Sequence, residues 1–144
     1  MIIPDANVLL YAYNADAPQG GRAASWLEST FSGTEPVRLP WQCVLAFLRI
    51  ATNPRAFDNP FPMEAAIDVV RQWFQSPSVG LIDPGERYWE ILSRLLVDSQ
   101  ASGKLVSDAA IAALAIENGA TLATTDKDFR RFDGLKLLDP LREG

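Results

Sequence analysis

Three aspartates that are far apart in the sequence each follow a short apolar run typical of a β-strand. The runs are residues 1–4, 105–107 and 121–125, and the acids after them are Asp5, Asp108 and Asp126. If the first and last runs are neighbouring parallel strands and Asp108 opens a helix on that sheet, all three carboxylates face its carboxyl edge, where open α/β sheets bind ligands. Clustered carboxylates favour a hard divalent cation, which takes oxygen ligands and keeps waters that a phosphate can replace. The spacing therefore predicts a metal site.

Helix capping is the alternative explanation for these acids. Asp5 and Asp126 both precede helix-like segments, where a carboxylate can accept hydrogen bonds from free amide groups and interact with the positive end of the helix dipole. For a lone aspartate, capping is the better explanation. Here three acids are expected at one edge of one sheet, and Asn7 and Asp128 follow two residues after Asp5 and Asp126. This recurrence favours a site.

The absence of histidine restricts the possible chemistry. The chain has no histidine, which excludes Ser-His-Asp and Cys-His triads, histidine-ligated zinc and imidazole acid–base catalysis. Cys43 is the single cysteine, so an internal disulfide and a cysteine zinc cluster are excluded as well. Its apolar neighbours predict a buried core thiol. Chemistry based on carboxylates and a cation is still open to this chain.

A net charge of −5 is unusual for a protein that binds nucleic acid, because such binding normally depends on Lys and Arg neutralising phosphates. A carboxylate site that carries a divalent cation is locally much less negative, however. Basic residues could also surround the acids. The candidates are Arg49, Arg55, Lys104, Lys127, Arg130 and Arg131.

Length and composition predict a single domain over residues 1–144. The 144 residues match the usual size of one domain, and 48% hydrophobic residues supply enough material for a core. No apolar run approaches the roughly 20 residues that a membrane helix needs. The amino terminus also lacks the pattern of a secretory signal. We therefore expect a cytoplasmic protein that does not associate with a membrane.

Strand-like and helix-like patterns alternate along the chain, which predicts an α/β fold with a central, mostly parallel β-sheet flanked by α-helices. Besides the three runs above, strands are expected at residues 37–39 and 79–82. Helices are expected at residues 8–13, after 18–21, and at 41–52, 63–74, 85–98 and 109–117.

Four segments together resemble a PIN domain, specifically the VapC toxins of bacterial toxin–antitoxin modules. They are residues 3–11, 39–55, 105–115 and 120–129, and they span almost the whole chain in the expected order. Their characteristic motifs are Pro4-Asp5-Ala6-Asn7, Phe47-Leu48-Arg49, Ser107-Asp108-Ala109 and Thr125-Asp126-Lys127-Asp128. The resemblance implies a PIN-like fold.

The resemblance also implies an activity. It is that of a Mg²⁺- or Mn²⁺-dependent endoribonuclease, which leaves 5′-phosphate and 3′-hydroxyl ends and is inhibited by a small VapB-like antitoxin. A homodimer is expected too. By motif match, Asp5, Asp108 and Asp126 are the metal-binding and catalytic acids, and Asp128 is an additional metal candidate. Supporting roles are expected for Asn7, Gln42, Thr124 and Thr125, and contacts to RNA for Arg49, Lys127 and Arg130.

One position departs from the family pattern. Many PIN domains place Glu directly before the Phe-Leu-Arg stretch, where this chain has Ala46. Gln42 lies one helical turn earlier on the same face, and its amide oxygen could ligate a metal or hold a water. Because this acid is missing, the main alternative is a catalytically silent PIN-like module that binds RNA or a protein. A Mg-dependent phosphatase of another α/β family is a weaker one, since the first strand is followed by Asp5-Ala6-Asn7 rather than Asp-x-Asp.

Overall fold

The computed structural model describes residues 1–142, and its centre is a parallel sheet. Within this range five strands pair in the order β3-β2-β1-β4-β5, and each of these pairings is parallel. The strands are β1 (Ile2–Pro4), β2 (Val37–Pro40), β3 (Val79–Ile82), β4 (Thr121–Ala123) and β5 (Lys136–Leu138). The predicted α/β class and the parallel sheet are confirmed.

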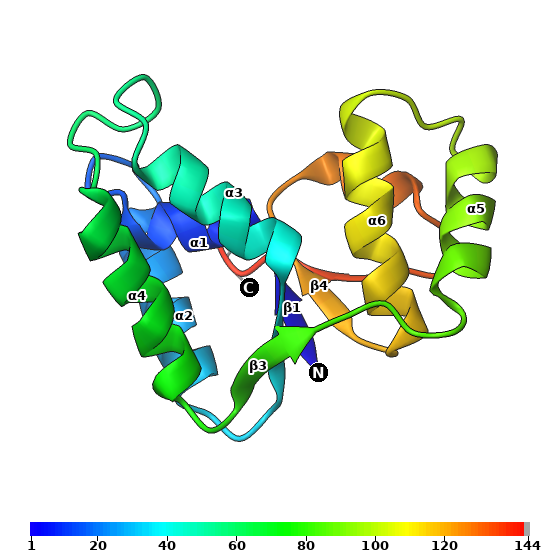
Figure 1. Cartoon of the computed structure of the whole chain (residues 1–144), viewed down its shortest axis with the longest axis horizontal. Helices are drawn as coiled ribbons and strands as arrows, with labels where there is room; N and C mark the ends of the chain where they lie inside the picture. The colour runs from blue at the N-terminus through cyan, green and yellow to red at the C-terminus, as the bar shows by residue number, and fades with distance from the viewer. Residues whose placement is uncertain (143–144) are drawn as a thin grey trace.

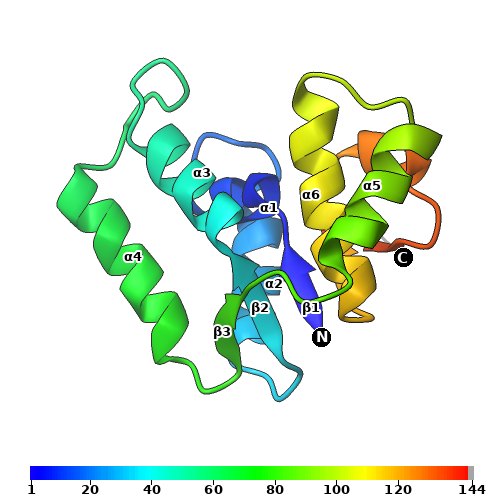
Figure 2. The same cartoon turned by 45° about the vertical axis from the view of Figure 1, so that its right-hand side comes forward.

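Helices supply the crossovers that parallel strands require. Between β1 and β2 lie α1 (Ala6–Tyr13) and α2 (Gly20–Phe31); between β2 and β3 lie α3 (Trp41–Ala51) and α4 (Met63–Gln75); between β3 and β4 lie α5 (Tyr88–Asp98) and α6 (Lys104–Glu117). A short 3-10 helix, η1 (Lys127–Arg131), connects β4 to β5. Figures 1 and 2 show α3 and α4 on one side of β1 and β2, and α5 and α6 on the other. None of the helices within residues 1–142 has the length and apolar character to cross a membrane.

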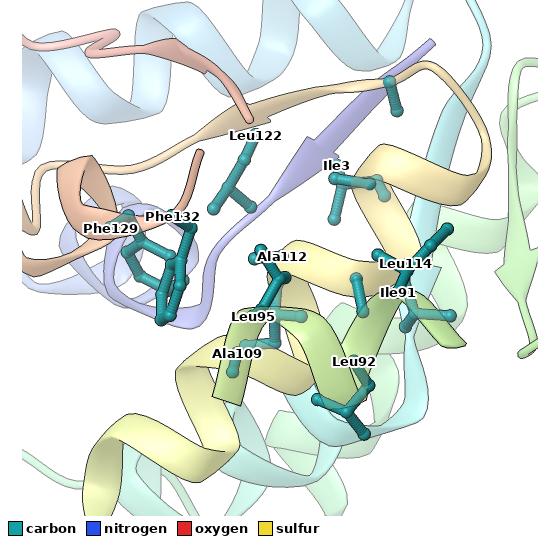
Figure 3. Packing of buried hydrophobic residues seen from close by; sticks show 14 of the residues in the cluster. Ile3, Ile91, Leu92, Leu95, Ala109, Ala112, Leu114, Leu122, Phe129 and Phe132 are labelled. Carbon is teal, nitrogen blue, oxygen red and sulfur yellow. The ribbon is translucent and has the colours of Figure 1, made fainter. Parts of the chain in front are cut away.

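Two apolar clusters hold the helices against the sheet. In the first, Ile3 of β1 and Leu122 of β4 pack against α5, α6 and η1, and Figure 3 shows Phe129 and Phe132 of the η1 segment beside them. The alanines of α6 have small side chains, which lets this helix approach the strands closely. The second cluster joins α1, α2, α3 and α4 to β2 and β3, with Phe47 and Trp73 among its largest members. Burying one such side chain contributes about 1.5–3 kcal/mol.

The prediction of a strand at residues 105–107 was wrong. Gly103 has a positive φ of 58°, and α6 begins directly after it, so Leu105, Val106 and Ser107 lie in the first turn of a helix. Val106 is 44% exposed, unlike a residue of a central strand. The run was too short to distinguish the two periodicities, whereas the alanine-rich stretch after Asp108 continues the helix. Asp108 therefore projects from a helix that is already one turn long.

Other boundaries differ by a few residues. The fourth strand ends at Ala123, so Thr124 and Thr125 belong to the loop after it. The helix expected from residue 85 begins at Tyr88. The helix-like segment expected after Asp126 is the short 3-10 helix η1. The strand β5 was not predicted, since it lies at the sheet edge with all three of its residues exposed and shows no alternating pattern. Cys43 is buried, as expected.

Candidate metal centre

The pairing of β1 with β4 brings Asp5 and the Asp126 loop to the same edge of the sheet. Pro4 is in register with Ala123, and the backbone N–H of Asp5 donates to the carbonyl oxygen of Ala123 at 2.8 Å. Asp126 follows three residues after that strand ends. Both acids thus lie at the carboxyl ends of adjacent parallel strands, the usual place for a ligand in such a sheet.

The Thr124 hydroxyl connects the two acids. It donates to Asp5 Oδ2 at 2.8 Å, and it accepts from the Asp126 N–H at 3.0 Å and from Asn7 Nδ2 at 3.4 Å. A hydroxyl has one proton and two lone pairs, so these three contacts use its full capacity. Thr124, which is only 5% exposed, therefore fixes Asp5 relative to the loop that carries Asp126.

Asn7 adds an oxygen close to the acids. Since Thr124 gives its proton to Asp5, Asn7 must direct Nδ2 rather than Oδ1 towards the hydroxyl. The remaining atom, Asn7 Oδ1, is buried and has no hydrogen-bond partner in the described part of the chain. It is an oxygen donor that a ligand could use.

Asp5 and Asp126 each cap a helix and also lie in the group of acids. Asp5 Oδ1 accepts from the Ala6 N–H at 2.8 Å at the start of α1, and Asp126 Oδ1 accepts from the Asp128 N–H at 2.9 Å at the start of η1. Each cap uses one carboxylate oxygen. The second oxygen of Asp126 is turned to a different partner.

That partner is Lys104, on the first turn of α6. Its Nζ donates to Asp108 Oδ2 at 3.1 Å and to Asp126 Oδ2 at 3.0 Å. The two acids, which come from different elements, thus converge on one cation. Sequence reasoning placed Lys104 only among the surrounding cations. The i,i+4 spacing of Lys104 and Asp108 was the available signal, and it was hidden because the residues between them were read as a strand.

Three carboxylates form a compact group here. One oxygen each of Asp108, Asp126 and Asp128 lies within 4.8 Å of the other two. Asp5 lies beside this group, and the negative charges of Asp108 and Asp126 both help to raise its pKa. The donors are all oxygen atoms, which suits a hard divalent cation. Two of them already share one cation, the Lys104 ammonium, so a metal ion could take its position.

The electrostatics of the acids differ from one another. Burial raises the pKa of Asp5. Burial also raises the pKa of Asp108, although the Lys104 ammonium opposes it. Partial burial acts in the same direction on Asp126, but the hydrogen bond from the Asp128 N–H and the charge of Lys104 outweigh it, so that the pKa of Asp126 is lowered. Asp126 is thus the acid that most readily stays ionised, and a cation would relieve the cost of charging the other two.

A cavity of about 740 Å³ opens onto Asp5 and Asp108. Its opposite wall is the face of α3 that carries Gln42, Ala46 and Arg49. Ala46 therefore contributes only a methyl group, and no carboxylate, to this wall. Gln42 Nε2 donates to the Ser107 carbonyl oxygen at 3.0 Å, which connects α3 to α6 and leaves the amide oxygen as an acceptor.

A second cavity, of about 200 Å³, is lined in part by Asp126. Its lining includes Thr125, Lys127 and Arg130, so these three predicted residues are separated from Arg49 and from the wall of α3. Arg142 also lines it and was not singled out from the sequence. It comes from the segment after β5, where the sequence shows no pattern that could have indicated a site.

Comparisons with known proteins identify the family of the chain. The family model described as PIN domain matches residues 2–135. Ribonuclease VapC37 of Mycobacterium tuberculosis is 41% identical over 140 residues, covering 97% of this chain and 97% of its own. Ribonuclease VapC33 of the same species is also 41% identical, over 143 residues, covering 99% and 100%.

A solved structure gives the same result for the fold. VapBC2 from Rickettsia felis, bound to a DNA fragment from its promoter, superposes with a TM-score of 0.68 at 18% identity and covers 96% of this chain and 98% of its own. The family model spans most of the chain and the two relatives span nearly all of it. The chain therefore belongs to the PIN-domain family, among the VapC proteins.

Proposed function

We propose that the chain is a metal-dependent endoribonuclease of the VapC type, the toxin of a toxin–antitoxin pair. The observation that carries the proposal is the convergence of carboxylate oxygens from α6 and the β4–η1 loop on one shared cation position. Relatives named as ribonucleases align over nearly the full length of the chain, which supports phosphodiester hydrolysis as the reaction. We take residues 1–144 as one catalytic domain. A cytoplasmic location of the protein is a separate prediction.

The proposed ion is Mg²⁺ or Mn²⁺, held by Asp108, Asp126 and Asp128 with Asp5 beside them. When bound, such an ion would bind the scissile phosphate, acidify the attacking water and stabilise the leaving oxygen. Lys104 has to move aside, at least in part, because its ammonium occupies the same carboxylate oxygens. Its long side chain is 66% exposed, so solvent leaves room for that movement.

The protein's own groups have separate proposed tasks. Asp126, whose pKa is lowered, stays ionised at neutral pH and can orient the attacking water or accept its proton. Thr124 and Asn7 hold Asp5 in place through the hydroxyl network. Thr125 faces the smaller cavity, where its hydroxyl can donate to a phosphate oxygen. None of these tasks requires histidine.

Ala46 leaves the centre with one carboxylate fewer than the family pattern. We propose that the Gln42 amide oxygen, oriented by the bond from Nε2 to Ser107, takes part of the role by holding a water without adding charge. The acids on the other walls still supply enough oxygen donors for one ion. Activity is therefore expected in spite of Ala46.

RNA, an antitoxin and a second copy of the chain are the proposed partners. Arg49, Lys127 and Arg130 flank the acids on different sides and would contact RNA phosphates. A VapB-like antitoxin could inhibit by placing an Arg among the carboxylates, since a guanidinium binds two carboxylate oxygens at once. Trp41 and Trp89 are 51% and 70% exposed, which is consistent with surfaces that become covered in a complex.

An RNA cleavage assay tests the proposed function. The purified chain should cut RNA in the presence of Mn²⁺, and EDTA should abolish the cleavage. Asp108→Asn should remove it, whereas Asp68→Asn should not, because Asp68 is an exposed acid that pairs with Arg71 on α4. If the wild-type chain cuts no RNA from a mixed pool but binds RNA or a protein partner, the silent-module alternative replaces this proposal.

A further inference from the structure

The basic side chains of this acidic protein fall into two groups. Several have partners within the protein: Arg38 donates to backbone carbonyls, Arg71 and Arg131 pair with acids, and Lys104 joins two of the catalytic candidates. By contrast, within residues 1–142 the side chains of Lys127, Arg130 and Arg142 have no hydrogen bond or ion pair to the protein, although all three line one cavity. Three cations without an internal partner are thus gathered at one place.

Two acids, Asp126 and Asp139, also line this cavity, but neither forms an ion pair with the three cations in the described part of the chain. Asp126 uses Oδ1 for the Asp128 N–H and Oδ2 for Lys104. Asp139 Oδ1 accepts from the Leu141 N–H at 3.0 Å within a tight turn. The cavity of about 200 Å³ therefore presents basic groups, together with the Thr125 hydroxyl, to an incoming anion.

Arg142 is held in position by the turn that carries it. Leu141 is buried, and its carbonyl oxygen accepts from Arg22 Nη1 of α2 at 2.8 Å. The Arg142 N–H donates to the Asp139 carbonyl oxygen at 3.4 Å. The segment after β5 is thus fixed to the body of the protein by the buried Leu141 side chain and the hydrogen bond from Arg22, and the Arg142 N–H bond closes the turn. This anchoring places Arg142 opposite Lys127 and Arg130, which come from η1.

We propose that this cavity, named here the flanking cavity and defined by Thr125, Lys127, Arg130 and Arg142, binds an RNA backbone phosphate next to the one that is cut. The proposal rests on the proposed function. Asp126 belongs both to the acid centre, which is the group of Asp108, Asp126 and Asp128 with Asp5 beside it, and to the wall of this cavity. A phosphate held in the cavity would therefore be one nucleotide along the RNA strand from a phosphate at the acids. Guanidinium groups bind phosphate oxygens in pairs, which suits Arg130 and Arg142.

Arg49 completes the arrangement on the other side. It lines the larger cavity together with Asp5 and Asp108, and it too has no internal partner among the described residues. The acids therefore lie between two cationic positions. An RNA strand that crosses the acid centre would meet a positive charge before and after it, which explains how a chain of net charge −5 can hold a polyanion.

Fluorescence anisotropy with a fluorescein-labelled single-stranded oligouridylate, in EDTA so that no cleavage occurs, tests the flanking cavity. Arg130→Gln and Arg142→Gln should each weaken binding by about fivefold or more. Each should also reduce the slope of log affinity against log salt concentration by about 0.7, the value for one lost phosphate contact on a single strand. Arg71→Gln is the matched control, because it removes the same charge from α4, which contacts the β3 edge of the sheet, opposite β5.

The outcomes separate this inference from the proposed function. If Arg130→Gln and Arg142→Gln bind like Arg71→Gln, or keep the wild-type salt dependence, the flanking cavity is not a phosphate site, even when the wild type cleaves RNA. If both variants bind more weakly than the control while the wild type shows no cleavage in Mn²⁺, the flanking cavity is still an RNA phosphate site but the proposed function fails. Mn²⁺ affinity, measured by calorimetry, should be the same in both arginine variants as in the wild type.

Discussion

At the scale of single residues, one buried hydroxyl determines how the acids are arranged. Thr124→Val keeps the shape of the side chain but removes the donor to Asp5 and the acceptor for the Asp126 N–H. We expect Mn²⁺ affinity to fall about 10- to 100-fold, as is usual when a group that orients a ligand is lost. The free energy of unfolding should fall by about 1–3 kcal/mol, because buried polar groups lose their partner. Calorimetry and urea unfolding measure the two effects.

Thr124→Ser is the control for this substitution. Serine keeps the hydroxyl with its proton and lone pairs, so it should retain most of the Mn²⁺ affinity. Loss of Mn²⁺ affinity in the serine variant but not in the valine variant would mean that the methyl group of Thr124, and not its hydroxyl, is what the centre needs.

The shifted pKa values of the acids predict opposite effects of pH at two positions. Burial raises the pKa of Asp5 above its ordinary value of 3.8, so its contribution to stability is fully present below that value and is lost as pH rises through the raised pKa. In EDTA at neutral pH, Asp5→Asn should therefore be more stable than the wild type. The difference should disappear once the pH falls below 3.8.

Asp126 should show the reverse behaviour. Partial burial raises the pKa of Asp126, but the Asp128 N–H and Lys104 lower it by more than burial raises it. The contribution of Asp126 to stability is therefore present at neutral pH and is lost as pH falls through the lowered pKa. Asp126→Asn should then be less stable than the wild type at neutral pH. Urea unfolding of both variants across the acidic range measures the two differences, and a shift of the same sign for both would contradict the electrostatic description.

At the scale of elements, the start of α6 positions Lys104 and Asp108. Gly103 has φ 58° and ψ −131°, a conformation that residues with a Cβ rarely adopt. Gly103→Ala should lower the free energy of unfolding by about 1–3 kcal/mol through backbone strain alone, since a Cβ there meets nothing within 4 Å. Thermal and urea unfolding measure this loss.

Gly21→Ala is the matched control for Gly103→Ala. A Cβ at Gly21 also meets nothing within 4 Å, but Gly21 lies within α2 and has no positive φ. Alanine should therefore stabilise the protein by about 0.4–1 kcal/mol. If both substitutions have the same effect, the conformation of Gly103 does not control where α6 begins.

The elements also explain how much the sequence could predict. Asp5 and Asp126 follow apolar runs long enough to indicate strands, and the rule for parallel sheets then places both at one edge. Asp108 was placed near them for a partly wrong reason, because a three-residue run at 105–107 fits a strand and a helix equally well. The Lys104 bridge depends on that helix and was missed with it. The segment after η1 has no periodicity, so Arg142 could be found only from the folded chain.

At the scale of the whole molecule, the acid centre and the exposed tryptophans predict association. Co-expression with the protein of a neighbouring short reading frame should yield a complex in which RNA cleavage is inhibited, and analytical ultracentrifugation of the chain alone should show a dimer. If the inhibitor uses an Arg among the carboxylates, excess Mn²⁺ should compete with it. A chain that stays monomeric at high concentration and binds no such protein would contradict both associations.

Titration of the metal-free protein with Mn²⁺ by isothermal calorimetry tests most directly whether Asp108, Asp126 and their neighbours form a shared cation site. Asp126→Asn should weaken binding, because it removes an oxygen that faces the cation position. Lys104→Met should strengthen it about tenfold, because the competing ammonium is lost. Asp68→Asn, an exposed acid on α4, should leave the affinity unchanged. Equal Mn²⁺ affinities in all four proteins, the wild type included, would contradict the metal centre described here.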